Sequence, residues 1–269
     1  MVEIPYFRAE DQEKIFYQTF GKGQVSLVFV PGLGAPTGKN YWKYQRHFSS
    51  SFELVFIDLP GTGKSTHGRK EYKISLFAKD VQTVVDNLGL KKVILIGHSL
   101  GSAVILDAEK LLFDKIIGLI DIDGLFARFH FAGTEEKAIQ EFLKPLKEDF
   151  YTNFLIAVRS MFTDRVKPKD LKIWTEEVKK LGRDSVISMV AELFRWNINA
   201  VLPLTRSPIK SIASTKTLQQ LGVSVEDYRT KFDPILLNDL GHVMMFEAPV
   251  SFNDALRQQI NKLSTESRI

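Results

Sequence analysis

The chain has 269 residues, of which 44% are hydrophobic and 25% are charged. This is enough to bury a large core, either in one domain with an insertion or in two small domains. The formal net charge is +4, from 36 basic and 32 acidic side chains spread along the sequence. Such a small excess gives no support for nucleic acid as a partner. Because the chain has no cysteine, disulfides, thiolate catalysis and cysteine-bound zinc are excluded.

The sequence shows no signal for targeting to a membrane. Residues 1–8 lack a basic region followed by an apolar run, so we expect no signal peptide. No apolar stretch approaches the roughly 20 residues that a membrane span needs. The sequence therefore predicts a cytoplasmic protein without a membrane span, and it leaves the oligomeric state open.

Short apolar runs that end at turn residues predict the strands of a sheet. Two antiparallel strands are expected at the N-terminus, and the unbroken apolar runs after them suit strands buried on both faces of a parallel sheet. The predicted strands are residues 3–8, 14–19, 25–30, 54–59, 93–96, 116–122, 209–214 and 234–238. Helical patterns fall between most of these runs, which indicates a mostly parallel α/β sheet.

Three helices of the core are predicted, and capping or terminating residues mark where two of them begin or end. Ser75 is the expected N-cap of a helix that stops at Gly89. A second helix is expected over residues 100–112, and Pro249 opens the last one.

A different pattern occupies residues 124–205, where helical periodicity continues without a convincing strand. This segment is also rich in aromatic residues. We expect it to form a helical cap between two parts of an α/β core, residues 1–123 and 206–269.

The sharpest motif is Gly97-His98-Ser99-Leu100-Gly101, a G-x-S-x-G between a predicted strand and a predicted helix. A serine at this position sits on a tight, strained turn with its hydroxyl exposed above the sheet. The N-terminus of the following helix favours negative charge on a substrate oxygen. The motif therefore predicts that Ser99 is a nucleophile, although its bare pattern also occurs in ordinary turns.

A serine nucleophile needs a base, and His242 is the best placed of the five histidines. It follows the last predicted strand, and loops at the carboxyl ends of parallel strands are where such folds place their chemistry. A plain surface histidine in a glycine-containing loop is the alternative. His47 and His67 are expected to be solvated, His98 to point away from the nucleophile, and His130 to be a candidate substrate contact.

These motifs together bring a family into view. The chain resembles the α/β-hydrolase superfamily over nearly all of its length, through PGLG (residues 31–34), DLPGTGKS (residues 58–65), GHSLG and the Gly-His pair before the last helix. The resemblance implies an eight-stranded, mostly parallel sheet flanked by helices, with the helical cap inserted after the sixth strand. It also implies a Ser-acid-His triad and an oxyanion hole made by the backbone amides of Leu33 and Leu100. The family usually has histidine where this chain has Pro31, which should alter loop packing more than amide geometry.

The position of the triad's acidic residue departs from the commonest pattern of that family. Most members place an aspartate after the strand that follows the cap, but residues 208–225 contain no carboxylate, and Lys216 and Thr217 stand where it is expected. Other members place the acid at the end of the strand after the nucleophile helix, where this chain has Asp121 and Asp123. We select Asp123, at the strand end, and keep Asp121 as the alternative. Either aspartate could instead cap a loop.

One segment, residues 61–65 (GTGKS), resembles the end of a phosphate-binding loop. That motif needs a glycine at position 58, where this chain has Asp58, and an apolar helix directly after it. We interpret the segment as the turn after a strand, near the mouth of the active site.

The sequence thus predicts a serine hydrolase that cleaves carboxylic esters of small to medium hydrophobic substrates through an acyl-enzyme, without metal or organic cofactor. Serine at position 99 argues against the dehalogenases and epoxide hydrolases of this fold, which use a carboxylate nucleophile. Lactone, C–C bond or thioester cleavage and acyl transfer use the same triad and stay open, as does a hydrolase-like receptor or signalling protein with incidental turnover. The candidate substrate contacts are Phe126, His130, Phe162, Trp196 and Val243.

Overall fold

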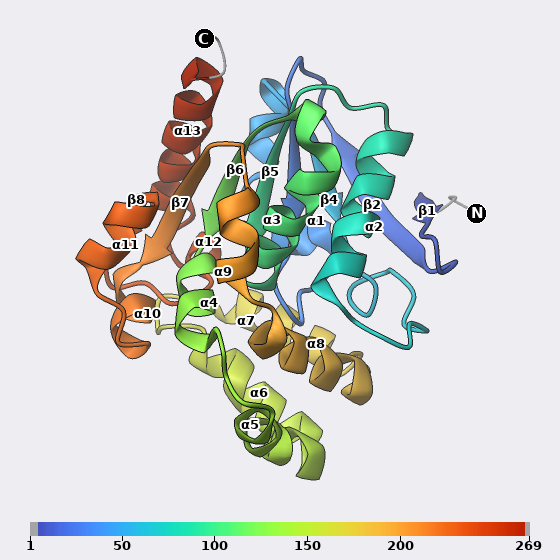
Figure 1. Ribbon diagram of the computed structural model, residues 1–269, viewed down its shortest axis with the longest axis vertical. Helices are drawn as coiled ribbons and strands as arrows, with labels where there is room; N and C mark the ends of the chain where they lie inside the picture. The colour runs from blue at the N-terminus through green and yellow to red at the C-terminus, as the bar shows by residue number, and fades with distance from the viewer. Residues whose placement is uncertain (1–4, 267–269) are drawn as a thin grey trace.

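An eight-stranded sheet forms the centre of the protein, and the computed structural model describes residues 5–266 without the side chains of residues 128–130 and 266 (Figure 1). The strands lie side by side in the order β1-β2-β4-β3-β5-β6-β7-β8. The first two run antiparallel to their neighbours, and all the others are parallel. The strand bounds are β1 (Tyr6–Arg8), β2 (Lys14–Phe20), β3 (Ser26–Val30), β4 (Glu53–Ile57), β5 (Val93–His98), β6 (Ile116–Ile122), β7 (Ile209–Ser214) and β8 (Asp233–Leu237).

The central strands are buried on both faces, as their unbroken apolar sequences predict. Every residue of β3 and of β5 is buried. The predicted fold class, a mostly parallel sheet of eight strands, is confirmed. Because parallel strands share one direction, their carboxyl ends meet at one edge, where loops from distant parts of the chain converge.

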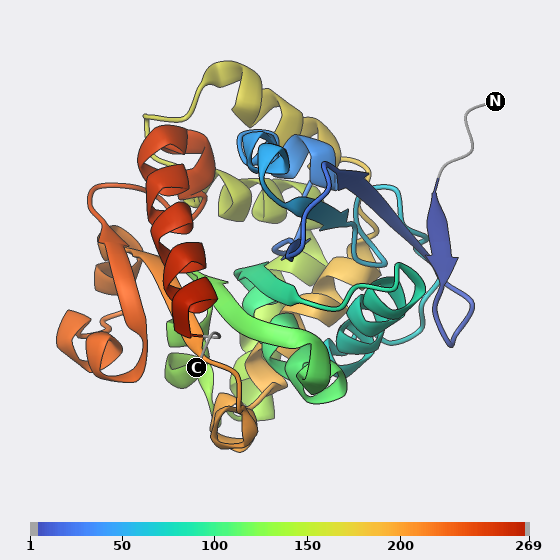
Figure 2. The same ribbon diagram turned by 90° about the horizontal axis from the view of Figure 1, so that it is seen from above.

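Helices cover both faces of this sheet. On one face α2 (Ile74–Asn87) packs against α3 (Leu100–Leu112), and α13 (Pro249–Glu266) lies across β6, β7 and β8 on the other (Figure 2). Shorter helical segments fill the connections: α1 (Gly38–Tyr41), η1 (Arg46–Ser50), η2 (Phe113–Lys115), α10 (Thr215–Gln220), α11 (Val225–Lys231) and α12 (Met244–Glu247). The predicted helices at residues 100–112 and from Pro249 are confirmed.

The start of α2 differs from the sequence-based prediction. The N-cap is Lys73, not Ser75, and the Lys73 side chain makes no hydrogen bond to the helix. The amide of Ile74 instead donates to the Glu192 side chain at 3.0 Å. A carboxylate from a distant helix satisfies a first-turn donor, so the helix begins before Ser75.

Residues 124–205, between β6 and β7, are helical throughout their regular structure. We call this segment the helical insert. Its helices α5 to α8 gather at the lower end of the molecule in Figure 1, and no helix in the described part of the chain is long and apolar enough to span a bilayer. The elements of the insert are α4 (Leu125–Phe131), α5 (Glu136–Glu148), α6 (Phe150–Ser160), α7 (Pro168–Val178), α8 (Arg183–Arg195), α9 (Ile198–Val201) and η3 (Leu202–Leu204).

The Gly-Thr-Gly-Lys-Ser segment forms a turn around a buried carboxylate. Asp58 follows β4, and its two oxygens accept from the Gly38 amide at 2.6 Å and the Lys64 amide at 2.8 Å. The Ser65 hydroxyl donates to the Asp58 carbonyl oxygen at 2.5 Å. The turn is therefore organised around a carboxylate of the chain itself, in accord with its interpretation as a structural turn.

This buried carboxylate generates a prediction about pH. Burial raises the pKa of Asp58 to about 7, against the opposing effect of the two amides. The folded protein thus holds this proton more tightly than the unfolded chain, and the contribution of Asp58 to the free energy of unfolding should fall as pH rises from about 4 to about 7. Each unit of pKa difference is worth about 1.4 kcal/mol. Asp58→Asn should flatten this dependence in urea unfolding at about pH 5 and about pH 7.5; an unchanged slope would contradict the assignment.

Candidate active site

Ser99 occupies a strained turn between β5 and α3. Its backbone has a φ of 54° and a ψ of −111°, a left-handed conformation that costs a non-glycine residue about 1–3 kcal/mol. The side chain remains partly exposed, while the residues on either side of it are buried. The turn therefore presents the hydroxyl at the carboxyl edge of the sheet.

The two glycines of the motif permit a close approach that no side chain would allow. A Cβ atom at Gly97 would lie 2.3 Å from the Gly101 carbonyl oxygen, and one at Gly101 would lie 2.3 Å from the Val30 carbonyl oxygen. The first turn of α3 is thus pressed against the ends of β5 and β3. This packing explains why the sequence needs glycine on both sides of Ser99.

Two backbone amides, one in the loop after β3 and one at the start of α3, make no hydrogen bond among the described residues. Within residues 5–266, the amides of Leu33 and Leu100 have no hydrogen-bond partner. The Gly32 amide, by contrast, donates to the Tyr41 hydroxyl at 3.3 Å. A Cβ atom at Gly32 would lie 3.2 Å from the Ser99 Cβ, so the loop of Leu33 lies against the serine.

His242 and Asp123 form a close pair at the same edge. The His242 Nδ1 atom lies 2.7 Å from the Asp123 Oδ2 atom, and the carboxylate is fully buried whereas the imidazole is 18% exposed. The other oxygen of Asp123 accepts from the Ser214 amide at 2.8 Å. With Nδ1 engaged, Nε2 is the ring nitrogen left for a substrate or a nucleophile.

The serine and this pair lie at adjoining strand ends. The Ser99 amide donates to the carbonyl oxygen of Ile122, the last residue of β6, at 3.0 Å, and Asp123 follows it directly in the chain. The His242 ring lies 4.6 Å from the ring of His98, the residue before Ser99. The carboxyl edge of the sheet thus holds the turn of Ser99 close to the pair of His242 and Asp123.

Asp121, the alternative acid, is used elsewhere. Its carboxylate is buried and accepts from the hydroxyls of Ser211 at 2.8 Å and Tyr228 at 2.9 Å. It also accepts from the amides of Gly124 and Leu125, each at 3.1 Å. Burial raises the pKa of this carboxyl against the opposing effect of its donors. Asp121 therefore holds the start of the insert and the neighbouring strand, while His242 pairs with Asp123.

A serine at the end of the strand that follows the insert contacts the acid directly. Ser214, at the end of β7, gives its amide to Asp123 and its hydroxyl to the Leu240 carbonyl oxygen at 2.6 Å. It thereby connects the acid to the loop that carries His242. The sequence analysis did not identify this role, because Ser214 has no local pattern that distinguishes it from an ordinary strand-end serine.

The helical insert contacts the same loops. Glu247, on α12, accepts from the Gly241 amide at 2.7 Å and from the Thr163 hydroxyl at 2.8 Å, which ties the insert to the loop of His242. A Cβ atom at Gly34 would lie 2.9 Å from the ring of Phe154, on α6. The insert therefore packs over the loops that follow β3 and β8.

The predicted substrate contacts occupy different surroundings. Phe162 lies edge-on to Trp174, with ring centroids 5.5 Å apart, and its Cα atom would lie 3.2 Å from a Cβ at Gly241, beside His242. Val243 is buried next to His242, and Trp196 is almost buried.

Phe126 packs edge-on against Tyr228, with ring centroids 5.4 Å apart. The backbone of His130 lies in α4, but its side chain is outside the described residues, so its contact with substrate stays a prediction. Among the predicted contacts, Phe162 and Val243 are those that adjoin the loop of His242.

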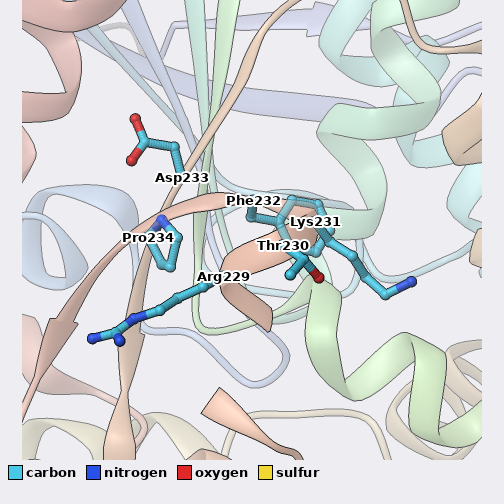
Figure 3. Close-up of a pocket in the computed structure, with 6 residues that line it drawn as sticks. All are labelled: Arg229, Thr230, Lys231, Phe232, Asp233 and Pro234. Atoms are coloured by element: carbon cyan, nitrogen blue, oxygen red, sulfur yellow. The ribbon is translucent and has the colours of Figure 1, made fainter. Parts of the chain in front are cut away.

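A surface pocket of about 430 Å³ lies away from this edge. It is formed where α11 meets the start of β8, and Figure 3 shows its lining side chains, Arg229, Thr230, Lys231, Phe232, Asp233 and Pro234. Because β8 is parallel to β5, the start of β8 is at the opposite end of the sheet from Ser99. This pocket is therefore separate from the candidate site. The described residues contain no group of histidine and carboxylate side chains suited to a metal ion.

Comparisons with known proteins agree with this architecture. The family model described as alpha/beta hydrolase fold matches residues 25–177, more than half of the chain. The acetyltransferase component of the acetoin cleaving system of Pseudomonas putida is 26% identical over 62% of this chain and 46% of its own length. A pimeloyl-[acyl-carrier protein] methyl ester esterase of Wigglesworthia glossinidia brevipalpis is 30% identical over 51% of each chain. The chain thus spans about half the length of these relatives.

A solved structure shares nearly the whole fold. Est816, described as an N-acyl homoserine lactone degrading enzyme, superposes with a TM-score of 0.78 over 94% of this chain and 99% of its own. Its sequence is 22% identical, so the likeness concerns the fold alone.

Proposed function

We propose that the chain, which belongs to the α/β-hydrolase family, is a serine hydrolase of carboxylic esters with Ser99, His242 and Asp123 as its triad. The observation that carries this proposal is the 2.7 Å contact between His242 Nδ1 and the buried Asp123 carboxylate, beside the strained turn of Ser99. A buried carboxylate that holds one ring nitrogen fixes the tautomer and leaves the other nitrogen as a base.

In the acylation step, the Ser99 hydroxyl oxygen attacks the ester carbonyl carbon while His242 Nε2 takes its proton. Negative charge develops on the carbonyl oxygen, and the free amides of Leu33 and Leu100 are suited to hold it. One such donor is worth roughly 3–4 kcal/mol in the transition state. The tetrahedral intermediate then collapses, the C–O bond to the alcohol breaks, and the alcohol leaves with the proton from His242.

Deacylation repeats these steps with water. His242 removes a proton from a water molecule, whose oxygen attacks the acyl carbon and forms a second tetrahedral intermediate. The bond to the Ser99 oxygen breaks, and the serine takes the proton back as the acid is released. The Asp123 carboxylate stabilises the imidazolium that forms in each half of the cycle.

We further propose that the helical insert, residues 124–205, is a cap that shapes the acyl site. Its contacts with the loops after β3 and β8 support this role. The aromatic content of the insert favours a hydrophobic acyl or aromatic substrate. A lactone is a cyclic ester, so the same steps would open it, and lactones belong among the substrates to be tested.

The first prediction concerns the nucleophile. Ser99→Ala should abolish hydrolysis of p-nitrophenyl esters, down to a residual rate about 10⁶-fold lower, because the attacking oxygen is lost. A fluorophosphonate probe should label the wild-type protein at Ser99, as located by peptide mass spectrometry. The urea unfolding curve of the variant should match the wild type. Labelling that persists in Ser99→Ala would remove this serine from the mechanism.

The second prediction separates the two neighbouring aspartates. Asp123→Asn should lower kcat by up to ~10⁴-fold, because the amide can no longer hold His242 in the required tautomer. Asp121→Asn is the matched control on the same strand. It should retain kcat, but it should lose about 1–3 kcal/mol of stability, because one of its oxygens becomes a donor within a buried network. The reverse pattern, with turnover lost only in Asp121→Asn, would make Asp121 the acid.

The third prediction tests the cap. Phe162→Ala should reduce the preference for p-nitrophenyl octanoate over acetate, measured as the ratio of kcat/KM values, by about 10-fold, since each buried methylene is worth about 0.8 kcal/mol. Phe142→Ala is the matched control, because this ring lies on α5 of the same insert and is exposed. Equal effects of the two substitutions would argue against a cap that contacts the acyl chain through Phe162.

A further inference from the structure

The buried side chain of His98 connects two loops of the candidate site. Its Nε2 atom lies 2.9 Å from the His242 carbonyl oxygen, and its Nδ1 atom is hydrogen-bonded to the Tyr41 hydroxyl. The Tyr41 oxygen in turn lies 3.3 Å from the Gly32 amide nitrogen. A continuous chain of hydrogen bonds thus runs from the loop after β3, past the residue before Ser99, to the backbone of His242.

The chemistry of the end groups determines the direction of each hydrogen bond. A carbonyl oxygen only accepts, so the proton between His98 and His242 must be on Nε2. Nδ1 of the neutral ring is then an acceptor, which requires the Tyr41 hydroxyl to donate to it. The Tyr41 oxygen keeps a lone pair that accepts from the Gly32 amide. One arrangement of protons therefore satisfies every polar group in this series of hydrogen bonds, from the Gly32 amide to the His242 carbonyl oxygen.

Both side chains are held in their neutral forms. Burial lowers the pKa of His98, and the nearby His242 lowers it further, whereas burial raises the pKa of Tyr41. A neutral imidazole is the form that can accept from Tyr41 and donate to His242 at once.

We propose that Tyr41 and His98 act as a positioning relay, which places the His242 backbone relative to the oxyanion loop; the inference rests on the proposed function of Ser99 and His242. The Asp123 carboxylate orients the His242 ring, and the His98 ring fixes the main chain that carries it. At the other end, the Tyr41 hydroxyl oxygen accepts the hydrogen bond of the Gly32 amide. The next amide, that of Leu33, is thereby left for the substrate oxygen.

The Tyr41 ring of the relay is packed closely among other aromatic rings. The Tyr41 ring packs against Trp42 at 4.7 Å and Trp174 at 5.3 Å between centroids, and against Phe246 at 6.1 Å. Trp174 belongs to the insert, and Phe246 belongs to α12 beside His242. Neither Tyr41 nor His98 has to contact substrate to influence the reaction, because both act through the positions of other groups.

Tyr41→Phe tests the relay with the smallest change, since it removes one hydroxyl and keeps the packed ring. We expect kcat for a p-nitrophenyl ester to fall by about 10- to 100-fold, because small displacements of catalytic groups have effects of this size. KM should change by less than about threefold, because ground-state binding is untouched. The matched control is Tyr72→Phe, another buried tyrosine whose hydroxyl makes two hydrogen bonds, to Ser185 and His67; its kcat should equal that of the wild type.

Two further readouts separate positioning from mere structure. The ¹⁵N shifts of His98 should show a neutral ring with its proton on Nε2 in both the wild type and Tyr41→Phe, because the His242 carbonyl oxygen only accepts, and the Nδ1 resonance should move in the variant, because that nitrogen loses its donor. His98→Gln keeps one donor and one acceptor about as far apart as the ring nitrogens, whereas His98→Leu keeps neither. The glutamine variant should therefore recover most of the kcat lost in the leucine variant.

The outcomes divide cleanly between the two proposals. Wild-type protein that is not labelled by a fluorophosphonate at Ser99 would overturn the proposed function and the relay together. Labelled wild type in which Tyr41→Phe and Tyr72→Phe have the same kcat would overturn the relay alone. Equal losses in His98→Gln and His98→Leu, with both variants folded by circular dichroism, would also overturn it.

Discussion

The contact between His242 and Asp123 is the interaction on which the site depends, and it joins residues that are 119 positions apart. It exists because β6 and β8 run in the same direction and end at the same edge of the sheet. Between them, β7 supplies Ser214, which bonds to the acid and to the loop of the histidine. The sheet thus acts as the frame that holds acid and base at hydrogen-bonding distance.

Close packing at the glycines of the serine motif adds the nucleophile to this frame. The first turn of α3 can approach β3 and β5 only because positions 97 and 101 lack side chains. That approach accompanies the positive φ of Ser99, and Leu100 directly after it is the first residue of α3. The energy stored in this turn is offset by the buried apolar surface of α3 and the strands around it.

Four carboxylates around the site hold backbone amides, some in neighbouring loops and some in distant segments. Asp58, Asp121 and Glu247 each accept from backbone amides that would otherwise lack partners in the loops of the carboxyl edge. Glu192 does the same for the start of α2. These carboxylates hold loops together at low dielectric, where an unpaired charge would be costly. The insert participates through Glu192 and Thr163, so hydrogen bonds join the core and the insert at two separate places.

The sequence by itself determined the strands, the mostly parallel sheet and the position of the serine turn, because apolar runs and G-x-S-x-G are local patterns with a local physical cause. It narrowed the acid to Asp121 and Asp123, which are two positions apart at the end of one predicted strand. Only the tertiary structure decided between them, because β6 ends at Ile122 and Asp123 lies beyond it with a φ of 52°, which takes it out of the strand pattern that Asp121 follows. Asp121 accepts from Ser211 and Tyr228, and Asp123 accepts from Ser214 and His242.

The sequence also could not show that Glu192, and not Ser75, satisfies an amide at the start of α2. Nor could it show the partners of His98. A hydrogen bond between segments tens to more than a hundred residues apart leaves no periodicity or spacing in the sequence. It arises from the distance and direction that the folded chain imposes on two polar groups.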